Sequence, residues 1–157
     1  MDGTTDNRYI QIAFYPVMMV MERAADLPEL EDSLKGRKVF IWTCNTCARL
    51  CNGMGGEDSA RRLAEELRRK GIDVIGIGST SASCLKAKVS AKGCPEISSC
   101  DVILSLTCDI GSACARSVFS KDVINPFRTL GTGYLDEDGT PRLKDGSPLT
   151  DRSEPYI

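Results

Sequence analysis

Short apolar segments alternate with helical segments along the middle of the chain, and this alternation limits the fold more than any other feature. Three segments of five residues read as buried strands: 38–42 (KVFIW), 73–77 (DVIGI) and 102–106 (VILSL). Residues 58–70 and 111–119 repeat apolar side chains at helical spacing instead. Strands that alternate with helices are typical of a parallel sheet covered on both faces. The sequence therefore predicts a small α/β domain, flavodoxin-like or Rossmann-like.

The two ends of the chain differ from this middle part. Residues 1–28 are expected to form an N-terminal extension, 29–135 the α/β domain and 136–157 an irregular C-terminal tail. Within the extension, residues 9–21 are rich in Met, and Pro16 excludes an uninterrupted helix there. We expect this segment to be an edge strand or an arm laid over a partner subunit.

Three smaller elements complete the expected plan. Residues 27–34 predict a short helix with a proline in its first turn, and residues 123–124 a short fourth strand. Residues 134–143 predict a hairpin around Asp138-Gly139. The rest of the tail is expected to become ordered only against a partner.

The composition excludes several kinds of chemistry. The 157 residues include eight cysteines and no histidine, so this chain has no Ser-His-Asp triad, no imidazole base and no zinc site with histidine ligands. A metal site would have to use thiolates and carboxylates. The net charge of −2 provides no basic excess for binding phosphates, so nucleic acid is not an expected partner.

The beginning of the chain bears on its location. Residues 1–7 carry acids and no base, whereas a secretory signal begins with positive charge. The apolar stretch 10–21 has 12 residues, and a membrane-spanning helix needs about 20. We therefore expect no membrane span and a cytoplasmic protein whose cysteines are reduced.

Cysteines follow each of the three predicted strands. Cys44 follows the first, Cys84 lies in the loop after the second, and Cys108 follows the third. The carboxyl ends of parallel strands meet at one edge of the sheet, where open α/β sheets bind ligands. Cys47 and Cys51 share the first loop, in the pattern Cys44-x₂-Cys47-x₃-Cys51. The sequence thus predicts a metal site with these five cysteines as candidate ligands.

Three glycines follow the first cysteine loop. Gly53, Gly55 and Gly56 are expected to let backbone N–H groups approach sulfide or thiolate sulfur, which makes them candidate cofactor-binding residues. A simpler interpretation of the loop stays open, because positions 44, 47 and 51 also have helical spacing and would then be core residues.

Two kinds of metal group are compatible with the cysteine pattern. Structural zinc usually takes two CxxC-type pairs, and only Cys44/Cys47 forms one. Several closely spaced cysteines plus distant ones favour an iron–sulfur cluster, [4Fe–4S] in particular, with zinc as the alternative. Cys94 and Cys100 precede the third strand, at its opposite end, and are expected to be structural. Cys114 is left open, as a ligand or a packing residue.

The cysteine motifs resemble a known family. The segments TCNTCARLCNGMGG and CDVILSLTCDIGSACA, with one lone cysteine between them, are similar to the C-terminal domain family of methylenetetrahydrofolate reductase, which includes MetV-like accessory subunits. The resemblance covers about residues 30–135. Asp109 stands where that family usually has glycine. The matching positions are Cys44, Cys47, Cys51, Gly55, Gly56, Cys84, Cys100, Asp101, Ile103, Leu104, Leu106, Cys108 and Gly111.

The resemblance implies an accessory, non-catalytic electron-transfer subunit of a hetero-oligomer. Its partner would be a flavin-containing methylenetetrahydrofolate reductase-like subunit, or a methyl-transfer or corrinoid protein of one-carbon (tetrahydrofolate) metabolism. The residues themselves show no P-loop and no complete dinucleotide fingerprint. Two alternatives remain: a zinc-stabilised interaction module, and a thiol enzyme with Cys108 as its nucleophile before a helix start.

Overall fold

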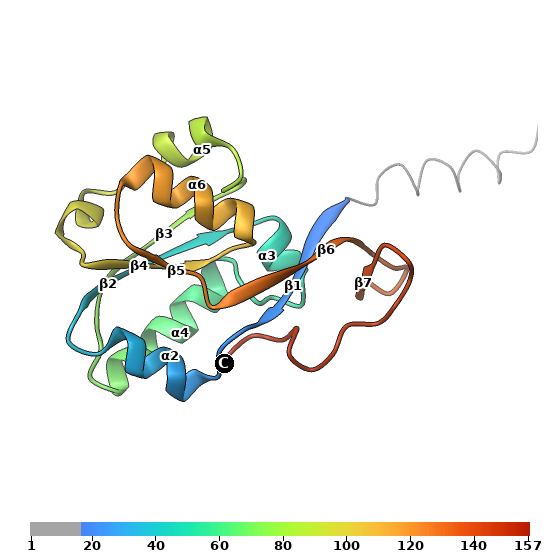
Figure 1. The fold of residues 1–157 in the computed structure, drawn as a ribbon, viewed down its shortest axis with the longest axis horizontal. Helices are drawn as coiled ribbons and strands as arrows, with labels where there is room; N and C mark the ends of the chain where they lie inside the picture. The colour runs from blue at the N-terminus through green and yellow to red at the C-terminus, as the bar shows by residue number, and fades with distance from the viewer. Residues whose placement is uncertain (1–16) are drawn as a thin grey trace, which may run out of the picture.

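A four-stranded parallel sheet forms the centre of the molecule (Figure 1). The computed structural model describes residues 17–157. The strand order is β3 (Asp73–Thr80), β2 (Lys38–Cys44), β4 (Val102–Leu106) and β5 (Val123–Ile124). All neighbouring strands pair in parallel. The structure confirms the predicted α/β class, and each of the four predicted strands forms.

Helices cover both faces of this sheet. Figure 1 shows α5 (Lys86–Ala91) and α6 (Asp109–Phe119) on one side, with α2 (Leu27–Leu34) and α4 (Glu57–Arg69) on the other. A 3₁₀ helix, η1 (Pro95–Ser99), lies in the connection before β4. The segments predicted at 27–34, 58–70 and 111–119 are all helical, within two residues of their expected limits. The helix α5 was not predicted.

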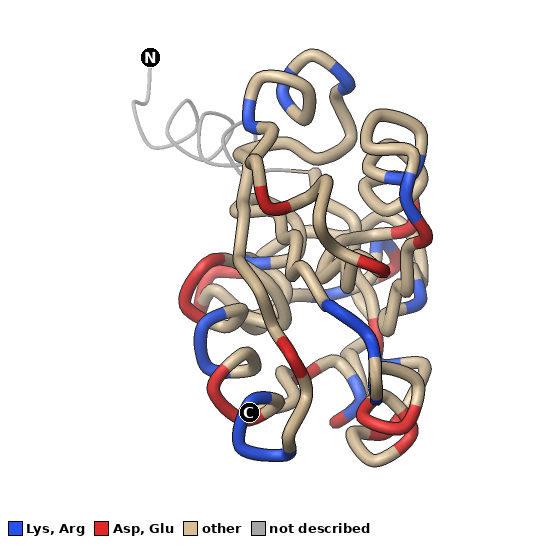
Figure 2. The backbone as a smooth tube through the Cα atoms, turned by 90° about the vertical axis from the view of Figure 1, so that its left-hand side faces the viewer, with Lys and Arg blue, Asp and Glu red and all other residues tan. Residues whose placement is uncertain are grey.

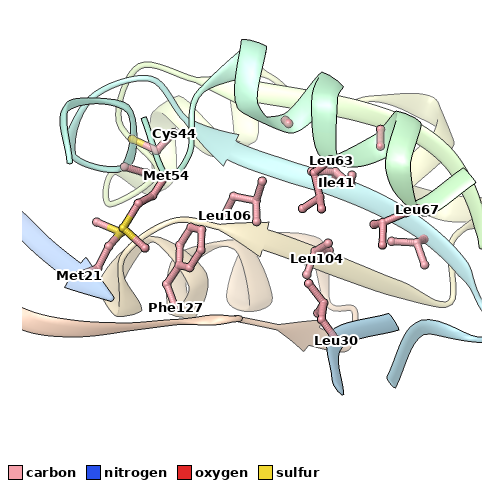
Figure 3. Close-up of a cluster of buried hydrophobic side chains, with 14 of the residues drawn as sticks. Met21, Leu30, Ile41, Cys44, Met54, Leu63, Leu67, Leu104, Leu106 and Phe127 are labelled. Atoms are coloured by element: carbon pink, nitrogen blue, oxygen red, sulfur yellow. The ribbon is translucent and has the colours of Figure 1, made fainter. Parts of the chain in front are cut away.

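The pleat of the strands divides the core in two. Ile41 and Leu104 face α4, where Leu63 and Leu67 cover them (Figure 3). Trp42, almost without solvent exposure, points to the opposite face and meets the ring of Phe119 edge-on, with ring centroids 5.1 Å apart. Each buried Leu, Ile or Phe side chain contributes about 1.5–3 kcal/mol of hydrophobic stabilisation. Because both faces of the parallel sheet are covered by apolar side chains, the strands are largely continuous runs of apolar residues in the sequence.

A second sheet packs beside the first. It is antiparallel and contains β1 (Met18–Arg23), β6 (Phe127–Leu135) and β7 (Pro141–Leu143), with β6 in the middle. Of residues 9–21, expected to be an edge strand or an arm over a partner, residues 18–21 lie in the edge strand β1, while residues 9–16 lie outside the described residues. The predicted hairpin is confirmed as β6–β7, with Gly139 at a φ of +78° in its turn.

The C-terminal tail packs against the chain itself, so the expectation that it orders only against a partner is wrong. Residues after β7 form no helix or strand, but they run back along β1. Ser153 is fully buried and its hydroxyl donates to the Met21 carbonyl at 2.7 Å. The Arg23 amide donates to the Arg152 carbonyl at 2.8 Å. Consequently the boundaries expected at residues 28 and 135 do not separate folded units.

No helix among residues 17–157 combines the length and the apolar composition needed to cross a membrane.

Candidate metal centre

Four cysteines from three strand ends line one cavity. Cys44 is the last residue of β2, and Cys47 begins the single-turn helix α3 (Cys47–Leu50). Cys84 lies in the loop after β3, and Cys108 directly precedes α6. The cavity has a volume of about 70 Å³, and the other residues that line it are Thr46, Ala48, Ala82, Ser83, Thr107 and Gly111. The convergence expected from the parallel sheet is therefore present for these four positions.

Close packing holds α3 against the end of the sheet. A Cβ atom on Gly55 would lie 2.6 Å from the Ala48 Cβ and 2.6 Å from the Leu106 carbonyl oxygen, so only glycine fits there. The Thr43 hydroxyl donates to that same Leu106 carbonyl at 3.0 Å and accepts from the Gly56 amide at 2.8 Å. These contacts fix the loop that carries Cys44 and Cys47.

A single buried hydroxyl positions the Cys84 loop. Ser83 Oγ accepts a hydrogen bond from Trp42 Nε1 at 2.9 Å and donates to the Gly111 carbonyl at 3.0 Å. It thereby connects β2, the loop after β3 and the first turn of α6. Of the four thiols around the cavity, only Cys84 is exposed. Thr46, which also lines the cavity, is exposed as well, so the wall of the cavity reaches the surface at these two residues.

Two of the thiols face backbone N–H groups. Burial raises the pKa of Cys108, and the amides of Gly111 and Ile110 at the start of α6 partly oppose that rise. Burial also raises the pKa of Cys47, whose sulfur accepts a hydrogen bond from the Met19 amide of β1 at 3.4 Å. Such N–H groups stabilise negative charge on sulfur.

The thiols are close enough to influence each other's ionisation. Cys44 and Cys84 add to the rise in the pKa of Cys47, after burial, because neighbouring thiolates repel. Cys47 and Cys44 act on Cys108 in the same way. A positively charged metal group between these sulfurs would reduce the repulsion at Cys47 and Cys108. Such a donor set is suited to a metal group and unsuited to four free thiolates.

Cys51 does not line the cavity. Its side chain is fully buried, and its sulfur donates to the Met21 carbonyl of β1 at 3.7 Å. Although Cys51 has helical spacing with Cys44 and Cys47, it follows α3 and faces the second sheet. The structure therefore groups four of the five candidate cysteines and leaves this one in the core.

The three candidate glycines lie outside the cavity as well. The amides of Gly53, Gly55 and Gly56 donate to Arg49 O, Ala48 O and Thr43 Oγ1, at 2.9, 2.9 and 2.8 Å. These N–H groups are thus already used within the chain. Their conformations instead shape the turn from α3 into α4, with Gly53 and Gly56 at positive φ.

The remaining cysteines have structural surroundings. Cys100 is buried at the end of the sheet opposite the cavity, next to the start of β2, as expected. Cys94 is half-buried and packs against the same hydrophobic cluster. Cys114, left open by the sequence, is buried on the face of α6 that packs against that cluster.

Among the residues that the structure describes, no three Cys, Asp or Glu side chains lie close enough together to hold a single metal ion as they stand. Comparisons with family models, curated proteins and solved structures find no match to this chain.

Proposed function

We propose that this chain is an accessory electron-transfer subunit that holds an iron–sulfur cluster, of the [4Fe–4S] type, through Cys44, Cys47, Cys84 and Cys108. One observation carries the proposal: four cysteines that follow three different strands line one cavity at the carboxyl edge of a parallel sheet. Four thiolates are the ligand set that such a cluster takes.

The arrangement of the thiols around a space supports a cluster over a single ion. In a tetrahedral zinc site, four sulfurs converge on one point at about 2.3 Å from the metal. In a cluster, each thiolate binds a different iron, so the ligands surround a larger volume. A single zinc ion would require at least three of the four cysteines to move closer together, whereas a cluster takes ligands that lie farther apart.

The residues around the cavity would act on a bound cluster through amide hydrogen bonds, through burial and through one exposed thiol. When bound, the cluster would supply one-electron transfer without proton transfer. The amides of Met19, Ile110 and Gly111 would stabilise charge on the sulfurs of Cys47 and Cys108. Cys108 is buried and Cys47 is half-buried, which would limit the access of water. Exposed Cys84 would provide the shortest route to a partner.

The proposed partner follows from the family resemblance over residues 30–135. We propose a flavin-containing methylenetetrahydrofolate reductase-like subunit, or a methyl-transfer or corrinoid protein, that carries out the chemistry on the one-carbon unit. The chain itself would be non-catalytic and cytoplasmic, with reduced thiols.

Metal analysis of anaerobically purified protein tests the proposal. We expect iron and acid-labile sulfide in equal amounts, about four of each per chain, with visible charge-transfer absorption that bleaches on reduction. A colourless protein that takes up neither iron nor sulfide after anaerobic reconstitution would rule the proposal out.

A zinc-stabilised interaction module is the second candidate. The pair Cys44/Cys47 favours it, because a CxxC spacing is typical of structural zinc sites. This candidate predicts one zinc per chain, no visible absorption and loss of folding in chelator. The same metal analysis distinguishes the two candidates.

A thiol enzyme has less support from the structure. An activated cysteine nucleophile needs a lowered pKa. Burial raises the pKa of Cys108, the cysteine that the sequence offered for this role.

A further inference from the structure

Large apolar side chains are exposed beside the opening of the cysteine cavity. Leu85 directly follows Cys84 and is 52% exposed, and Ile110 directly precedes Gly111 and is 50% exposed. Cys84 and Gly111 both line the cavity, and the hydrogen bond from Ser83 to the Gly111 carbonyl joins the two segments. Exposed apolar side chains next to a functional site are typical of a docking surface.

Positive charge lies along α5, which begins directly after Leu85. Lys86, Lys88 and Lys92 lie on α5 or directly after it, and all three are exposed. Residues 74–95 contain no Asp or Glu. Figure 2 shows Lys and Arg without Asp or Glu at the top of the molecule, where Figure 1 places α5. None of the three lysines forms an ion pair with a described residue.

Asp109, the acidic residue of α6, is hydrogen-bonded on the side of the second sheet. It follows Cys108, and its carboxylate accepts hydrogen bonds from the Asn125 side chain at 3.0 Å and from the Thr129 amide at 3.4 Å. These partners hold it toward the second sheet. The surface next to Cys84 therefore carries the exposed apolar side chains of Leu85 and Ile110, with exposed lysines on the α5 side.

We propose that the surface formed by Cys84, Leu85, Lys86, Lys88, Lys92 and Ile110, here called the Cys84 face, binds an acidic surface on the protein that exchanges electrons with the cysteine site. This inference rests on the proposed function. One electron would pass between the partner's redox group and the group held by the thiolates, one being oxidised as the other is reduced, with no bond formed or broken. Complementary charge accelerates and orients such encounters.

A protein fits this face better than a nucleic acid or a membrane does. The whole chain carries a net charge of −2, so three lysines form a local patch and not the extended basic surface that phosphates require. The apolar centre next to an exposed thiol also matches the small interfaces of electron-transfer partners, with charged residues around a dry contact.

Binding of a small acidic electron carrier tests the proposal. The probe is a flavodoxin, titrated into the anaerobically purified chain by calorimetry at low and high salt. We expect measurable binding that weakens with salt, and an affinity at least about tenfold lower in Lys86→Glu/Lys88→Glu/Lys92→Glu. The control variant is Lys35→Glu/Lys38→Glu/Lys70→Glu, which changes the net charge by the same amount but at the opposite end of the sheet. We expect this control to bind flavodoxin far better than the first variant.

Several results would overturn the docking proposal: no flavodoxin binding, binding insensitive to salt, or equal loss in the two triple variants. Binding of single-stranded RNA or anionic phospholipid vesicles at the Cys84 face, without flavodoxin binding, would also overturn it.

Metal analysis of the same samples separates the two proposals. Iron without flavodoxin binding refutes the docking surface alone, and flavodoxin binding without iron refutes the iron–sulfur function.

Discussion

Ser83 joins three parts of the candidate site through one hydroxyl group. It lies next to Cys84, accepts the Trp42 indole N–H and donates to the first turn of α6. Trp42 has no solvent exposure, so its N–H has no water to replace the lost partner if Ser83 is changed. A buried donor without a partner costs about 1–3 kcal/mol.

We therefore predict that Ser83→Ala lowers the free energy of unfolding by about 1–3 kcal/mol, measured by urea denaturation. Ser98→Ala is the matched control, because the Ser98 hydroxyl donates to the Pro95 carbonyl in an exposed turn. We expect less than about 0.5 kcal/mol for the control. Equal stability of the two variants would show that the Trp42–Ser83 contact does not hold the loop.

At the residue scale, the sequence predicted the positions of Cys44, Cys84 and Cys108 because strand ends can be located from local pattern. It could not separate Cys51 from Cys47. Both follow Cys44 at helical spacing and both contact β1, yet Cys47 begins α3 and lines the cavity, whereas Cys51 follows α3 and is buried in the core. The sequence did not show that α3 ends after one turn, and this end places Cys51 outside the cavity.

At the scale of elements, β1 connects the second sheet to the candidate metal centre. One edge of β1 pairs with β6, and the opposite edge meets α3, where the Met19 amide donates to the Cys47 sulfur. Because this N–H points away from β6, a proline at position 19 removes the hydrogen bond to sulfur and leaves the pairing with β6 possible.

We predict that Met19→Pro shifts the midpoint potential of the reconstituted protein to a more negative value, since fewer hydrogen bonds to sulfur disfavour the reduced, more negative state. Redox titration measures the shift. Met19→Leu keeps the amide and should retain the wild-type potential. If the two variants have the same potential, the Met19 amide has no role in setting it.

The elements of the parallel sheet were predictable because each has its own pattern. The strand at 102–106 and the helix at 27–34 match the structure to the residue. The second sheet was predicted only in parts, as an edge strand and a hairpin. β1 pairs with β6 across more than 100 residues of sequence, and this pairing, unlike helix periodicity, leaves no local signal.

At the scale of the whole molecule, the last residues close the fold against β1 and the start of α2. The Tyr156 hydroxyl donates to the Ala25 carbonyl at 2.6 Å, and its ring stacks on Phe127 with centroids 6.1 Å apart. Burial raises the pKa of Tyr156 from 10.0 to about 12. The folded chain therefore favours the neutral phenol.

This shift predicts a dependence of stability on pH. The contribution of Tyr156 is complete below its unfolded-state pKa of 10.0 and is lost as pH rises through its folded-state pKa of about 12. We expect the difference in unfolding free energy between wild type and Tyr156→Phe to be constant below pH 10 and to decrease above it. A difference that stays constant through pH 12 would show that Tyr156 is not buried in solution.

The central claim is that Cys44, Cys47, Cys84 and Cys108 hold one metal group and that Cys51 does not. The most direct measurement is the iron and sulfide content of Cys84→Ser and Cys51→Ala after anaerobic reconstitution, with circular dichroism to confirm folding. Cys84 is exposed, so its replacement should leave the fold intact. We predict that Cys84→Ser loses the intact four-iron cluster and its wild-type spectrum, while Cys51→Ala keeps wild-type iron, sulfide and spectrum. Wild-type content and spectrum in Cys84→Ser, together with loss of the cluster in folded Cys51→Ala, would contradict it.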